Sequence, residues 1–134
     1  QVVIVSPWVT MKAIEDDGLV PLVNAAVQRR AKVVVVIDPD KVRENSGLRR
    51  GVEAIAHLKN AGAVVCEVAN LHAKSLIAYP GMIIEGSFNW LSAQRTAGDR
   101  YLYHEASWRI TGSQAPAKVQ EALDEYKKLG VKLD

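Results

Sequence analysis

Hydrophobic residues fall into short valine-rich runs separated by longer stretches with helical spacing. The runs VVIV at 2–5, VVVVI at 33–37 and AVVCEV at 63–68 do not alternate with polar residues, which is typical of strands buried on both faces. The segments 18–31 and 47–62 between them carry apolar residues at helical spacing, which predicts amphipathic helices. This alternation predicts parallel strand pairing with right-handed crossovers.

The second half of the chain has a different pattern. We expect two strands, at 71–79 and 82–90, joined by a Pro-Gly turn, then a strand at 101–111 and an amphipathic helix within 113–130. The polar stretch 38–47 is expected to form a loop. Together these elements predict an α/β fold in which a mixed, mostly parallel sheet is flanked by helices.

Composition limits the class of protein. The chain has 134 residues, 49% of them hydrophobic, so we expect one domain over 1–134, cut from a longer protein because Gln1 begins a strand-like run. A net charge of +2 permits a phosphate-rich partner without requiring one. The single cysteine, Cys66, excludes an intramolecular disulfide and favours a reducing, cytoplasmic compartment. No apolar run approaches the roughly 20 residues of a membrane span, so no membrane partner is expected.

Four polar side chains interrupt the two strands predicted within 71–90. They are His72, Lys74, Ser87 and Asn89. If Pro and Gly are the two central residues of a tight hairpin, Lys74 faces Ser87 and His72 faces Asn89 on one side of the hairpin. Opposed Cβ atoms lie roughly 5 Å apart, so the four groups would converge on one small anion. Glu85 shares this parity and would lie nearer the turn.

These four groups have complementary chemistry. A neutral imidazole is a nucleophile near pH 7, an ammonium neutralises a phosphoryl oxygen, and an amide and a hydroxyl supply further donors. They meet the needs of attack on a phosphodiester without a metal. No His or carboxylate cluster has metal-ligand spacing, so neither metal nor cofactor is expected. The alternative is the solvated face of an ordinary hairpin.

This stretch resembles the signature of the phospholipase D superfamily, which runs His-x-Lys, four residues, Asp, six residues, then Gly-Ser-x-Asn. Here His72-Ala-Lys74 is followed at the same spacing by Tyr79 and then by Gly-Ser-Phe-Asn at 86–89. The order of predicted elements is also similar to the α/β/α sandwich of that family. The single copy of the motif resembles the small bacterial endonuclease branch, and the extension NWLS at 89–92 is similar to nuclease domains fused to DNA-processing or defence proteins.

The resemblance implies a metal-independent phosphodiesterase, with DNA endonuclease activity through a covalent phosphohistidine as the first expectation. His72 would be the nucleophile. Lys74 and Asn89 would hold the non-bridging oxygens, and Ser87 would assist them. An acidic residue downstream orients the histidine in the family, and Glu105 is the best match. The alternative is a catalytically silent module that binds nucleic acid or mediates dimerisation within a larger protein.

The single motif has a consequence for assembly. In-line displacement needs a nucleophile on one side of phosphorus and an acid on the other. The resemblance therefore implies a homodimer in which two copies of His72 share one site, with an interface that includes the end of the Gly-Ser-Phe-Asn strand and residues Trp90 to Arg95.

Tyr79 departs from the family pattern, because Asp usually occupies this position. Strand alternation places Tyr79 on the opposite face from His72, beside the turn. We therefore interpret the usual Asp as a structural residue whose replacement leaves the site intact.

Contacts to nucleic acid, with DNA expected before RNA, are predicted outside the motif. Four basic residues bracket one polar loop: Lys41, Arg43, Arg49 and Arg50. They form either a rim for phosphates or a solvated surface patch. Trp8 follows the first predicted strand, so it would emerge at the sheet edge where ligands of α/β folds bind and could stack on a base. Burial beneath the next helix is the alternative.

Overall fold

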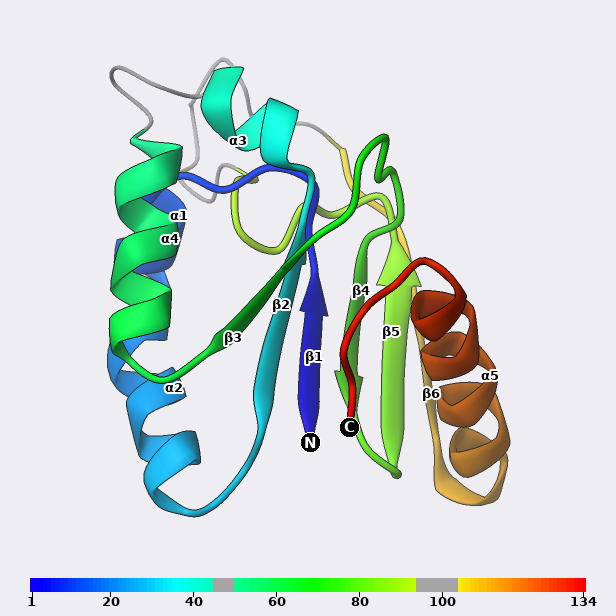
Figure 1. Cartoon of the computed structure of the whole chain (residues 1–134). Helices are drawn as coiled ribbons and strands as arrows, with labels where there is room; N and C mark the ends of the chain where they lie inside the picture. The colour runs from blue at the N-terminus through cyan, green and yellow to red at the C-terminus, as the bar shows by residue number, and fades with distance from the viewer. Residues whose placement is uncertain (45–49, 94–103) are drawn as a thin grey trace.

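The computed structural model describes residues 1–44, 50–93 and 104–134, and their six strands form one sheet (Figure 1). The strands are β1 (Val2–Val5), β2 (Val33–Ile37), β3 (Val64–Glu67), β4 (Ser75–Ala78), β5 (Met82–Gly86) and β6 (Ser107–Thr111). Their order across the sheet is β3-β2-β1-β4-β5-β6.

The sheet is mixed. The pairs β1–β2 and β2–β3 are parallel, whereas β1–β4, β4–β5 and β5–β6 are antiparallel. The α/β class and the mixed sheet flanked by helices are confirmed. The expectation of a mostly parallel sheet is not, because antiparallel neighbours predominate among the described strands.

Helices cover both faces of the sheet (Figure 1). They are α1 (Met11–Asp16), α2 (Leu19–Gln28), α3 (Pro39–Glu44), α4 (Gly51–Asn60) and α5 (Ala115–Lys128). Buried residues of α1, α2 and α4 pack on one face of the sheet, and those of α5 pack on the other. Within the described residues, no helix is long and apolar enough to cross a membrane.

Strand β2 shows why the valine runs do not alternate with polar residues. Val33 and Val35 belong to the core on the α1, α2 and α4 side, and Val34 and Val36 belong to the core beneath α5. All of its residues are buried. Since both faces of the strand are covered, an apolar side chain is required at every position.

Helix α3 occupies most of the stretch that was expected to be a loop. The Oδ1 atom of Asp38 accepts a hydrogen bond from the N–H of Asp40 at 3.0 Å, and Pro39 opens the first turn. An Asp cap followed by Pro is a favourable helix start, because Pro has no N–H to leave unpaired. The loop prediction is therefore wrong for residues 39–44, while 45–47 lie outside the described residues.

The β4–β5 hairpin differs in register from the prediction by one residue. Ala78 pairs with Met82, so three residues form the loop in place of the two expected. The N–H of Gly86 donates to the carbonyl of Lys74 at 3.4 Å, so Lys74 faces Gly86 and not Ser87. The expected cross-strand pairing of the four polar residues is therefore wrong, because one added loop residue shifts every partner.

Candidate functional site

Three of the predicted catalytic residues meet at one edge of the sheet. They lie where β4 begins and β5 ends, and Figure 1 shows these two points of the sheet side by side. His72 and Lys74 precede β4, and Ser87 follows β5. They border an open pocket of about 480 Å³ whose other lining residues are Ala73, Ser75, Glu85 and Gly86. An imidazole, an ammonium and a hydroxyl thus share one concave surface, although the register that was expected to bring them together is absent.

The backbone around the motif explains this convergence. Residues 71–74 precede the strand and are not part of the sheet. The Nζ atom of Lys74 turns back to donate to the carbonyl of His72 at 2.7 Å. On the other side, the N–H of Ser87 donates to the carbonyl of Ala106 at 3.0 Å, which holds the end of β5 against the start of β6. The polar groups therefore meet where the strands end and not across a regular ladder.

Lys74 lies in an electrostatic environment that disfavours its charge. Partial burial lowers the pKa of its ammonium, and the nearby charge of Lys41 lowers it further. The carboxylate of Glu105 acts in the opposite direction and raises this pKa. The ammonium of Lys74 thus interacts with one neighbouring cation and one neighbouring anion.

Lys41 lies beside the motif, closer to it than the rim position that was expected. Its Nζ donates to the carbonyl of Leu71 at 2.6 Å and lies 3.5 Å from Oδ2 of Asp38. The Asp38 side chain is only 3% exposed. Helix α3 is therefore joined to the residue before His72 through an ammonium that is itself fixed by a buried carboxylate.

Glu105 contacts Ser87 and not the histidine. A short hydrogen bond joins the hydroxyl of Ser87 to Oε2 of Glu105. That hydroxyl also accepts from the N–H of Ala106 at 3.0 Å. No hydrogen bond or ion pair joins Glu105 to His72 among the residues that the structure describes. The predicted role of Glu105 in orienting the imidazole is thus not visible, whereas its place beside the site is.

Asn89 lies apart from the other three motif residues. It does not line the pocket beside His72. Its Oδ1 atom is buried without a hydrogen-bond partner among the described residues, and its main-chain carbonyl accepts from Ser92 and Ala93 at 3.1 and 2.8 Å. The structure therefore brings His72, Lys74 and Ser87 together and leaves the amide outside the group.

A series of hydrogen-bonded side chains at the pocket was not predicted from the sequence. The hydroxyl of Ser75, which directly follows Lys74, lies 2.6 Å from the hydroxyl of Tyr126 on α5 and donates to Oε1 of Glu85 at 3.2 Å. Burial raises the pKa of Tyr126. A polar Ser at an inward strand position was the available signal, since a buried hydroxyl needs a partner. These hydrogen bonds hold the start of β4 against α5.

Two other basic residues that were predicted to contact nucleic acid form ion pairs with neighbouring carboxylates. Arg43 is exposed and pairs with Asp40 at 3.0 Å, and Arg50 pairs with Glu53 at 3.4 Å. Arg49 lies outside the described residues, as do the positions 94 and 95 of the expected dimer interface.

Two further expectations concern the position of Trp8 and the absence of a metal site. Trp8, which follows β1, is half-buried. It is neither fully exposed for stacking on a base nor fully buried beneath a helix. Within 1–44, 50–93 and 104–134, no three His, Cys, Asp or Glu residues form a cluster that could hold a metal ion.

No protein-family model matches the sequence, and no curated protein matches it. Among solved structures the chain is similar to TrmBL2, an archaeal chromatin protein described as showing a novel mode of DNA binding, with a TM-score of 0.52 and 15% identity. The similarity covers 95% of this chain and 42% of that chain, so this chain spans less than half the length of that protein. At this identity the likeness is one of fold.

Proposed function

We propose that this chain is a phospholipase D-like phosphodiesterase domain that cleaves DNA without a metal ion. The observation that carries the proposal is the pocket in which His72, Lys74 and Ser87 meet, from segments whose spacing resembles the two halves of the phospholipase D signature. His72 is exposed, so a substrate can reach its imidazole. DNA binding by a protein of similar fold supports nucleic acid as the substrate class.

The reaction takes place in two displacements. In the first, a ring nitrogen of His72 forms a bond to phosphorus while the P–O bond to the leaving strand breaks, and the leaving oxygen takes a proton. In the second, water attacks the phosphohistidine, the P–N bond breaks, and the histidine is regenerated. Lys74 offsets the charge that develops on the non-bridging oxygens. Ser87 donates to them if its hydroxyl leaves Glu105.

The first displacement needs an acid opposite the nucleophile. We assign that role to His72 of the partner subunit in a symmetric dimer, because the chain has one His-x-Lys motif and a two-fold contact is the commonest assembly. Mixing wild-type and His72→Ala chains tests this assignment. A shared site predicts that activity falls more steeply than the dilution of wild type, whereas a fully active monomer excludes it.

A second candidate function is a silent module that binds nucleic acid. One observation favours it: Asn89, a member of the motif, lies outside the pocket. The pocket would then hold a phosphate without cleaving the diester.

One assay separates the two functions. Labelled single- and double-stranded DNA is incubated with the protein in EDTA, beside His72→Ala and the matched control His57→Ala, whose imidazole is exposed on α4. Cleavage that resists EDTA, survives in the His57 variant and is lost in the His72 variant supports the enzyme. Binding by all three proteins without cleavage supports the silent module. Strict dependence on a divalent ion contradicts the mechanism.

A further inference from the structure

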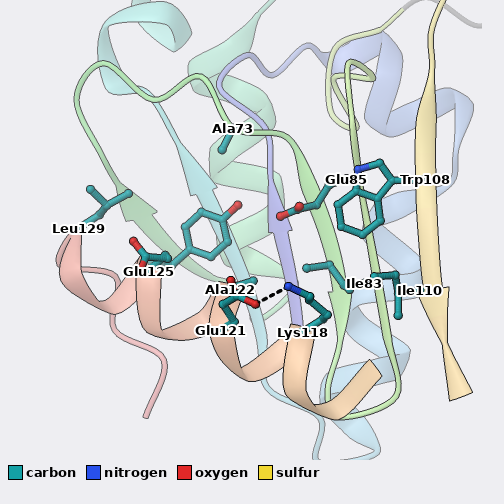
Figure 2. A pocket seen from close by; sticks show the side chains of 11 residues that line it. Ala73, Ile83, Glu85, Trp108, Ile110, Lys118, Glu121, Ala122, Glu125 and Leu129 are labelled. Carbon is teal, nitrogen blue, oxygen red and sulfur yellow. Dashed lines mark hydrogen bonds and ion pairs between the residues drawn. The ribbon is translucent and has the colours of Figure 1, made fainter. Parts of the chain in front are cut away.

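We call the pocket that His72, Lys74 and Ser87 line the phosphate pocket. A second concave surface lies next to it, between α5 and strands β5 and β6 (Figure 2). Its volume is about 580 Å³, within the roughly 300–1,000 Å³ of ligand sites. The lining residues are Ala73, Ile83, Glu85, Trp108, Ile110, Lys118, Glu121, Ala122, Glu125, Tyr126 and Leu129. We call this surface the α5 groove.

The α5 groove exposes large apolar side chains at its rim. Trp108 is 48% exposed and Leu129 is 54% exposed. Figure 2 shows the indole of Trp108 beside Glu85 on the neighbouring strand, and the two residues are direct cross-strand partners. An exposed indole next to an apolar floor provides a flat surface on which an aromatic ring can stack.

The charged groups of the α5 groove are largely paired with each other or with neighbours. Lys118 binds Glu121 at 2.7 Å, as the dashed line in Figure 2 marks, and Lys128 binds Glu125 at 2.6 Å. Glu85 accepts from Ser75 at 3.2 Å. Lysines offset the charges of Glu121 and Glu125, whereas Glu85 bonds a neutral hydroxyl and keeps its negative charge. The groove therefore suits an uncharged planar group whose edge carries N–H donors.

The α5 groove and the phosphate pocket adjoin each other. Ala73 and Glu85 line both of them. A group that is joined through one sugar to a phosphate beside His72 would therefore reach the groove. In a nucleic acid, the group attached at that distance is the base of the adjoining nucleotide.

We propose that the α5 groove holds an unstacked nucleobase of the nucleotide next to the bound phosphate, with its ring on Trp108. The carboxylates of the groove then accept hydrogen bonds from the exocyclic amino groups of bases. This inference rests on the proposed nucleic-acid substrate and adds to it that the strand is single or locally unpaired, because a paired base cannot enter the groove. Stacking of one base contributes roughly 5- to 150-fold in affinity.

The test measures binding without turnover, in the His72→Ala background. The probes are a single-stranded oligonucleotide, a strand of equal length and charge that lacks bases, and the corresponding duplex. Trp108→Ala should weaken binding of the single strand by roughly 5- to 150-fold and leave binding of the strand without bases unchanged. Trp108→Phe should restore most of the affinity. Tyr79→Ala removes a similarly exposed ring, 49%, from the far end of the hairpin and should change nothing.

The outcomes separate this inference from the proposed function. Equal weakening for strands with and without bases, or no effect of Trp108→Ala, overturns the base site whether or not the protein cleaves DNA. Selective weakening in a protein that does not cleave DNA supports the base site and contradicts the enzyme. Absence of binding to every probe overturns both.

Discussion

The Nζ atom of Lys41 lies 2.6 Å from the carbonyl oxygen of Leu71, the residue directly before His72. Through this bond, helix α3 fixes the segment that carries the proposed nucleophile. Because Asp38 holds the same ammonium from a buried position, the contact is anchored within the core of the domain. The site therefore depends on α3, which lies outside the motif.

Lys41→Met is expected to lower activity by about tenfold or more. The variant removes a charge-assisted hydrogen bond, worth roughly 1.5–3 kcal/mol, from the segment that positions His72. Lys41→Arg keeps a donor and should retain more of the activity. Cleavage rates measured beside thermal unfolding separate the two causes. A loss of activity that merely follows a loss of folded protein would contradict a positioning role.

The pKa of Lys74 should respond in opposite directions to two neighbours. Lys41→Met removes a positive charge that lowers this pKa and should raise it, whereas Glu105→Gln removes a negative charge that raises it and should lower it. Because the pKa of Lys74 is below that of an ordinary lysine, phosphate binding should weaken at a lower alkaline pH than an exposed lysine would require. Titration of the Lys74 ammonium by NMR measures both shifts. Shifts of the same sign would show that another group controls the site.

Glu105 and Ser87 should act as one unit. Because the carboxylate bonds the serine hydroxyl, Glu105→Gln and Ser87→Ala should each lower turnover, and the double variant should lose less than the sum of the two effects in free energy. If Glu105 instead orients His72 directly in the substrate complex, Glu105→Gln alone should cost roughly two to four orders of magnitude and Ser87→Ala much less. A double-mutant cycle on the cleavage rate distinguishes the two roles.

Gly86→Ala should destabilise the fold by roughly 1–3 kcal/mol, as overpacking does. A Cβ atom at this position would clash with the main chain of Ala106 and Ser107, where β5 and β6 approach closely. Gly81→Ala is the matched control, since a Cβ atom there meets no neighbour. Denaturant unfolding measures both changes. Equal stabilities would show that the start of β6 adjusts freely.

Much of the fold could be predicted from the sequence, since burial leaves a direct mark on it. The unbroken valines of β2 indicated a strand covered on both faces, and the amphipathic stretches between strands indicated the covering helices. The directions in which the strands pair were harder to predict from the sequence. The residues of β4 do not indicate that it pairs with β1 in the antiparallel direction. The order of strands in a sheet depends on contacts between residues that are far apart in the sequence.

The site was predictable in its residue types and less so in its geometry. The spacing of the histidine, lysine and serine identified three groups that do share a pocket. The hairpin register was wrong because turn length cannot be read from Pro-Gly alone. Lys41 was expected at a rim, but its contact with Leu71 is long-range and leaves no local signal. Helix α3, by contrast, has a local signal in its Asp-Pro start.

The proposed mechanism requires a covalent bond between His72 and phosphorus, and this bond can be captured during turnover. DNA labelled at phosphorus is mixed with the protein in EDTA, quenched in alkali during turnover, and the labelled peptide is identified by mass spectrometry. A phosphohistidine intermediate predicts an acid-labile, alkali-stable label on His72, present in His57→Ala and absent in His72→Ala. Cleavage of DNA with no label on His72, or with the label on another residue, would contradict it.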